Sequence, residues 1–132
     1  MLRKRYLFLD DERSPSNVDW IQLPFLSDEE WEIVRDFSQF KQWIENYGLP
    51  DVVSFDHDLA DFGHREKTLD KDERTGLDCA KFMVDWCLDH DLACPSFFVH
   101  SKNLAGKENI QELLSQFALF QKLKNTNIKH KP

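Results

Sequence analysis

Residues 6–13 have the sequence Tyr-Leu-Phe-Leu-Asp-Asp-Glu-Arg, an apolar run that stops abruptly at two carboxylates. The same pattern occurs in residues 52–58, which end in Asp-His-Asp, and in residues 97–101, which end in His-Ser. Short apolar runs of this kind suit strands buried on both faces, as in a parallel sheet covered by helices. In open α/β sheets, ligands bind beyond the carboxyl ends of the strands. The pattern therefore predicts that acids, imidazoles and a hydroxyl meet at one sheet edge.

The segments between these runs carry helical patterns. Apolar residues at helical spacing predict a helix that Ser38 caps and Gly48 ends, and further helices over 78–88 and about 105–120. Residues 33–35 form a plausible short edge strand. Alternating strands and helices favour parallel strands joined by right-handed crossovers. We therefore expect a small three-layer α/β sandwich with about four parallel strands.

Bulk properties fit one globular domain. The chain has 132 residues, of which 41% are hydrophobic, so it can bury a substantial core. We expect a domain over residues 1–121 and a basic, solvated tail over 122–132, which holds four lysines and no acid. No segment resembles a signal peptide or approaches the roughly 20 apolar residues of a membrane span. The odd number of cysteines suits buried thiols in a reducing cytosol, so a cytoplasmic location is expected.

Charge restricts the ligands that this domain can attract. The net charge is −7, and without the tail the body carries 13 basic and 24 acidic groups, a net charge of −11. Such a body does not attract bare nucleic acid through long-range electrostatics. A phosphate-bearing ligand would therefore need a metal cation, helix amides or a local basic group. A nuclease that follows a long polyanion is accordingly a weak interpretation.

The acid pair Asp10-Asp11 and the aspartate Asp56 stand at two strand ends. Hard divalent cations such as Mg²⁺ bind oxygen ligands and usually keep several waters. These three carboxylates are therefore candidate ligands for Mg²⁺ or Mn²⁺. The alternative is that Asp11 only caps a turn.

His57 and Asp58 directly follow Asp56 and admit several roles. His57 has a side chain that titrates near neutrality, so it could act as a general acid or base. It could also ligate a metal while a carboxylate orients its other nitrogen, or it could simply bond a loop carbonyl. If the strand breaks at Asp56, all three residues can line the crevice.

His100 and Ser101 end the last apolar run, just before a predicted helix. Backbone N–H groups at a helix start favour an anion, and Lys102 adds a positive charge. Asn103 could add a donor or simply cap the helix. Trp20 follows the first turn and could overhang the site. The loop over 61–74 could be a lid or a plain connection, and His64 within it and His90 are expected to be structural or solvated.

The arrangement resembles the receiver domains of two-component signalling. Asp56 matches the phosphoacceptor position and Ser101 the hydroxyl position. The likeness to ordinary receivers fails at His57, at the missing long helix after the first strand, and at the absent fifth strand ending in lysine.

A closer resemblance is to the cyclic-phosphate-processing receiver-like domains found in bacteria and phages. The motifs that carry it lie at Leu9–Pro15, Asp56–Leu59, Thr75–Gly76 and His100–Gly106. The resemblance implies a receiver-like, flavodoxin-like α/β/α fold and action on cyclic phosphates in RNA repair. Leu104 replaces an expected proline, and the insert over 61–74 leaves the substrate open.

The leading functional hypothesis is a metal-assisted hydrolase, a phosphodiesterase that opens a cyclic phosphate on a nucleotide or RNA end. The alternatives are a non-catalytic receiver-like switch and a phage-type interaction protein that binds a metal or a partner protein at the same crevice. No membrane association is expected. The candidate residues are His57, His100 and Asp58 for catalysis, Asp10, Asp11 and Asp56 for the metal, and Arg13, Ser101, Lys102, Asn103 and Gly106 for phosphate.

Overall fold

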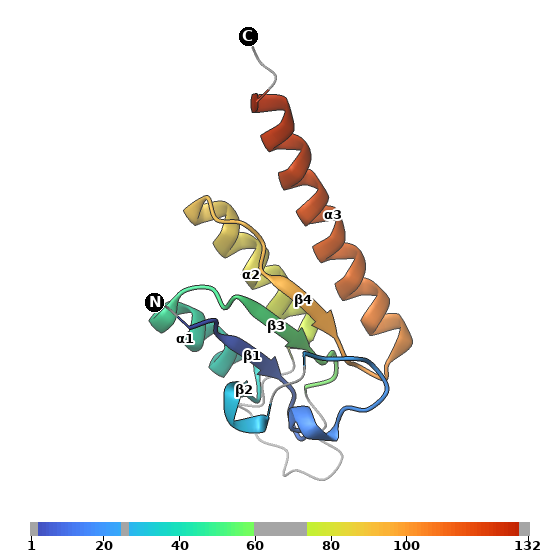
Figure 1. The fold of residues 1–132 in the computed structure, drawn as a ribbon. Helices are drawn as coiled ribbons and strands as arrows, with labels where there is room; N and C mark the ends of the chain where they lie inside the picture. Colours follow the sequence, from blue (N-terminus) through green and yellow to red (C-terminus); the bar gives the residue numbers. More distant parts are fainter. Residues whose placement is uncertain (1–2, 25–26, 60–73, 130–132) are drawn as a thin grey trace.

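The computed structural model describes residues 3–24, 27–59 and 74–129 (Figure 1). Four parallel strands form its sheet in the order β2-β1-β3-β4. Their bounds are Tyr6–Leu9 for β1, Trp31–Val34 for β2, Val52–Phe55 for β3 and Ser96–Val99 for β4. The predicted α/β sandwich with four parallel strands is confirmed. The predicted lid over 61–74 lies, apart from Arg74, outside the described residues, as does His64.

The described residues form three helices, and each starts one or two residues earlier than predicted. Helix α1 spans Phe37–Tyr47, α2 spans Gly76–His90 and α3 spans Leu104–Lys129. The cap of α1 is Asp36 instead of a serine, because its Oδ1 accepts a hydrogen bond of 2.8 Å from the Gln39 N–H. Gly48 ends α1 with a φ of +84°, which suits glycine. None of the helices in the described ranges is long and apolar enough to cross a membrane.

Helix α3 is longer than predicted. It continues to Lys129 instead of ending near Phe120, so it passes through the expected boundary between domain and tail. Figure 1 shows its C-terminal half extending beyond the rest of the domain. Leu119, Phe120 and Leu123 on this half are more than half exposed. The basic end of the chain is therefore helical as far as Lys129.

The two faces of the sheet are covered differently. Leu7, Leu9, Val53 and Phe55 point to one face and form a single core cluster with apolar residues of all three helices. The opposite face carries Phe8, Trp31 and Val52, which pack with Val18 and Leu23. The third layer is therefore the irregular segment between β1 and β2, with two short 3₁₀ turns at Pro15–Asn17 and Asp28–Glu30, instead of a helix. This segment lies at the edge to which the strands point (Figure 1).

Candidate functional site

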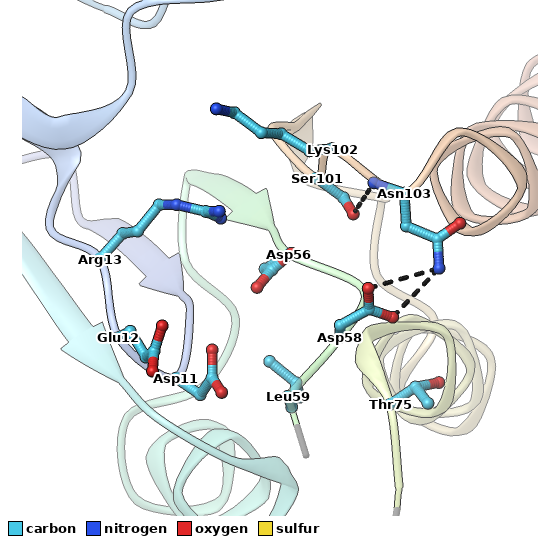
Figure 2. Close-up of a pocket in the computed structure, with 10 residues that line it drawn as sticks. All are labelled: Asp11, Glu12, Arg13, Asp56, Asp58, Leu59, Thr75, Ser101, Lys102 and Asn103. Atoms are coloured by element: carbon cyan, nitrogen blue, oxygen red, sulfur yellow. Dashed lines mark hydrogen bonds between the residues drawn. The ribbon is translucent and has the colours of Figure 1, made fainter. Parts of the chain in front are cut away.

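A cavity of about 440 Å³ opens at the carboxyl edge of the sheet (Figure 2). Its size lies within the range of small-ligand sites, roughly 300–1,000 Å³. The residues that line it come from the ends of β1, β3 and β4 and from the start of α2. They are Asp11, Glu12, Arg13, Asp56, Asp58, Leu59, Thr75, Ser101, Lys102 and Asn103. The predicted position of the site, beyond the strand ends, is therefore occupied by a cavity of suitable size.

Three carboxylates gather at the base of this edge. One oxygen each from Asp10, Asp11 and Asp56 lies within 4.8 Å of the other two, so the cluster could hold a metal ion. Burial raises the pKa of Asp56 to about 7, and the negative charges of Asp10 and Asp11 add to this. Asp56 thus stays largely protonated below about pH 7 unless a cation offsets the charges around it. This crowding of acidic oxygens fits a hard divalent cation.

Asp10 differs from the other two acids because it is fully buried. Its Oδ1 accepts the backbone N–H groups of Glu12 at 2.9 Å and Arg13 at 2.7 Å. Its Oδ2 lies 3.0 Å from His100 Nε2 and 3.5 Å from Arg13 Nη1. Burial alone would raise the pKa of Asp10, but these donors outweigh it and hold the pKa below its ordinary value. Asp10 is therefore an acceptor beneath the cavity that is ionised at neutral pH.

His100 belongs to a buried chain of hydrogen bonds. It is fully buried, and burial lowers its pKa despite the neighbouring Asp10. In the neutral ring, Nε2–H donates to Asp10, so Nδ1 accepts from the Ser54 hydroxyl at 2.7 Å. The ring also stacks on Phe8, with 4.4 Å between centroids and 6° between planes. His100 thus positions Asp10 from below and does not line the cavity, contrary to the expected convergence at the crevice.

His57 is also not among the residues that line the cavity. Its Nδ1 donates to Asp58 Oδ1 at 2.8 Å, and its ring lies against Gly106 in the first turn of α3. Asp58 does line the cavity and also accepts from Asn103 Nδ2 at 3.1 Å. Burial opposes ionisation of Asp58, but the bonds from His57 and Asn103 together outweigh it and lower the pKa of Asp58 overall. Gly106, predicted to bind phosphate, therefore accommodates the His57 ring instead of facing the cavity.

The remaining predicted phosphate residues do line the cavity. Ser101 Oγ accepts the Asn103 N–H at 3.1 Å, and Asn103 Oδ1 caps α3 by accepting the Gly106 N–H at 2.9 Å. Arg13 and Lys102 bring positive charge to the cavity, and both lie above Asp11 in Figure 2. The cavity thus combines acidic oxygens with two cations and neutral polar groups.

Comparison with known proteins agrees with this geometry. A family model described as the cyclic-phosphate processing receiver domain matches residues 5–116, which is most of the chain. The chain belongs to this family. Comparison with the curated proteins and with the solved structures gives no match. The resemblance to the cyclic-phosphate-processing receiver domains, which the sequence motifs indicated, is therefore confirmed.

The Thr75–Gly76 motif of this receiver domain joins α2 to the end of β3. Thr75 begins α2 and bonds to Asp78 as a capping box. The Gly76 N–H donates to the His57 carbonyl at 2.8 Å. A Cβ at Gly76 would collide with the backbone carbonyl of Asp56. The glycine therefore lets α2 approach the end of β3, where the candidate metal ligand Asp56 lies.

Gly76→Ala is expected to destabilise the receiver domain by about 1–3 kcal/mol, because a backbone atom and not a flexible side chain must move. The displacement of Asp56 should also weaken Mg²⁺ binding. Urea denaturation and calorimetric Mg²⁺ titration would measure the two effects. Ser38→Ala, at an exposed position in the first turn of α1, is the control. Unchanged stability and affinity would contradict the close approach of α2 and β3.

Two residues that support the site were not found from the sequence. Ser54 lies in the middle of β3 and is completely buried. Arg35 Nη1 donates to the carbonyls of Asp10 at 3.0 Å and Arg13 at 2.7 Å, which holds the turn after β1. A serine within an apolar run needs a buried hydrogen-bond partner, so the position of Ser54 could have indicated its structural role. Nothing in the sequence indicated the role of Arg35, because its partners are backbone atoms distant in sequence.

Proposed function

We propose that this receiver domain is a metal-assisted phosphoesterase that opens a cyclic phosphate on a nucleotide or RNA end. The observation that carries the proposal is one cavity in which the carboxylates of Asp11, Asp56 and Asp58 face the cations of Arg13 and Lys102. Family membership supports the substrate class. A fold of this type hosts signalling as well as catalysis, so the proposal rests on the site.

Asp11 and Asp56 are the proposed direct ligands of a Mg²⁺ or Mn²⁺ ion, since both line the cavity. Asp10 is proposed to support the site without binding the metal directly, because its two oxygens already have four donors within 3.5 Å. A bound divalent cation would neutralise charge on the phosphate and on the developing alkoxide. This arrangement would also allow a strongly acidic protein to hold an anionic substrate.

Asp58 is the proposed general base. It is ionised at neutral pH, reaches the cavity and is oriented by His57 and Asn103. The oxygen of a water molecule would form the new bond to phosphorus while one ring P–O bond breaks. The water proton would pass to Asp58, and the departing ribose oxygen would take a proton from solvent in the open cavity. His57 and His100 would then act as positioning residues, and their predicted catalytic roles remain to be tested.

Incubation of the protein with nucleotides and short RNAs ending in 2′,3′-cyclic phosphate tests the proposal. Phosphorus NMR should show loss of the strained-ring signal in the presence of Mg²⁺ or Mn²⁺ and no loss with a chelator. The position of the phosphate in the product would identify the bond that breaks. A folded protein that binds the metal but leaves the ring intact would instead fit the non-catalytic switch.

Asp58→Asn is expected to lower kcat by roughly 10²–10⁴-fold, the usual contribution of a general base. Asparagine can keep an acceptor for His57 but cannot take the proton from water. Rates should be measured under saturating metal, and Asp85→Asn, at an exposed position of α2, is the matched control. An Asp58→Asn variant with unaltered kcat would exclude Asp58 as the base.

A further inference from the structure

Trp20 brings together the two cations of the cavity, although it comes from the irregular segment after β1. The Lys102 ammonium lies 4.1 Å from the centroid of the Trp20 ring, and the Arg13 guanidinium carbon lies 5.1 Å from it. Both distances are within the range of attractive cation–π contacts, about 6 Å. Arg13 follows β1 and Lys102 follows β4, so the indole joins charges from two strand ends.

The indole is itself held in a defined position. Its Nε1–H donates to the His100 carbonyl at 2.7 Å, and that carbonyl lies at the end of β4, two residues before Lys102. Trp20 is partly buried by this contact. The ring therefore cannot move independently of the strand end that carries Lys102.

The two cations differ in what else restrains them. Arg13 Nη1 lies 3.5 Å from the buried Asp10 carboxylate, and its positive charge also lowers the pKa of Asp56 against the stronger effect of burial. Lys102 is exposed, and an exposed lysine has many rotamers to lose on binding. Contact with the ring directs its ammonium group toward the side of the cavity where Arg13 lies (Figure 2).

We propose that Trp20, Arg13 and Lys102 form a preorganised anion subsite for the non-bridging oxygens of a phosphate group, with Trp20 as its positioning residue. The inference deepens the proposed function and rests on it for the identity of the physiological ligand. The subsite lies beside the acid cluster, since Arg13 Nη1 is 3.5 Å from Asp10 Oδ2, so its positive charge offsets the repulsion of an anion by these carboxylates. Two cations near one phosphate favour a group that presents at least two charged or partly charged oxygens.

Calorimetric titration with inorganic phosphate, in the presence of Mg²⁺, tests the subsite without any turnover. Trp20→Leu is expected to raise the Kd for phosphate about five- to tenfold, because Lys102 loses its orientation. Lys102→Met should have a similar effect. The double variant should lose little more than the worse single variant, since both remove the same interaction. The Kd for Mg²⁺ alone should not change.

Tyr47→Leu provides the matched control. Tyr47 also carries a cation on its ring, with the Arg5 guanidinium carbon at 4.4 Å, but it is exposed at the far end of α1. Its replacement should leave phosphate binding unchanged. In turnover with a cyclic phosphate, Trp20→Leu should raise KM with kcat nearly constant, which a general loss of folding would not produce.

The inference would be overturned by the absence of phosphate binding by the unaltered protein, by an unchanged Kd in Trp20→Leu, or by full additivity in the double variant. Binding of uridine that disappears in Trp20→Leu would show that the ring stacks a base instead. If phosphate binding depends on Trp20 but no cyclic phosphate is opened, the subsite stands and the proposed function fails.

Discussion

Asp56→Asn is expected to make the metal-free protein more stable near pH 8 and to abolish its stabilisation by Mg²⁺. Most replacements of a buried polar residue destabilise a protein. Here the carboxylate is 4% exposed and stands beside two other acids. Asparagine keeps the oxygen that accepts the His57 N–H at 2.8 Å but removes the charge. The replacement therefore relieves repulsion at little cost in hydrogen bonding.

The sign of this effect follows from proton binding. The pKa of Asp56 is raised from 3.8 to about 7 in the folded protein, so between these values the folded state holds a proton that the unfolded state has lost. Stability of the metal-free protein consequently falls as the pH rises from about 4 to about 7. A difference of about 3 between the two pKa values corresponds to about 4 kcal/mol above pH 7. For a chain of this length the expected gain in Tm is on the order of 10 °C.

Thermal unfolding with a chelator, repeated across this pH range, would measure the effect. The variant and the unaltered protein should be equally stable near pH 5, because a protonated aspartate resembles asparagine. They should diverge toward pH 8, and only the unaltered protein should gain stability from Mg²⁺. Asp85→Asn should behave as the unaltered protein does. A variant that is less stable near pH 8, or that still responds to Mg²⁺, would contradict the placement of Asp56 in the cluster.

His100→Ala is expected to destabilise the protein by about 3–5 kcal/mol. The replacement leaves Ser54 and Asp10 without their shared partner in a fully buried position, and it removes the ring that stacks on Phe8. A buried polar group without a partner costs about 1–3 kcal/mol, more when it is charged, and the cavity adds to this. His57→Ala removes a more exposed ring with one bond to Asp58, so its cost should be about 1 kcal/mol.

Urea denaturation of both variants would measure these costs. Mg²⁺ affinity should fall by roughly 10–100-fold in His100→Ala, as is typical when an outer residue that supports a metal site is removed. His100→Gln could restore both bonds, with its amide N–H donating to Asp10 and its carbonyl accepting from Ser54. If His100 only positions Asp10, this variant should recover metal affinity and keep the pH profile of kcat. Loss of one limb of the pH profile of kcat in His100→Gln would instead support the catalytic role predicted for His100 from the sequence.

The sheet edge illustrates what could be predicted and why. Apolar runs ending in acids predicted the parallel strands, and parallel strands bring their carboxyl ends to one side. Asp10, Asp11 and Asp56 were therefore correctly grouped as a cluster that could hold a metal. The roles of the neighbouring histidines depend on side-chain direction, which the spacing of residues along the chain left open at both strand ends.

The sequence by itself determined the strand and helix pattern, the family and the grouping of the acids, because these depend on local apolar periodicity and on motifs within short segments. Only the tertiary structure decided which groups are buried. His100 shares a sheet face with Phe8, and that face is covered by the segment between β1 and β2, so its imidazole is enclosed beneath Asp10. Gly106 leaves room for the His57 ring, which turns Asp58 toward the cavity. The raised pKa of Asp56 has the same origin, since it depends on burial and on charges brought close by folding.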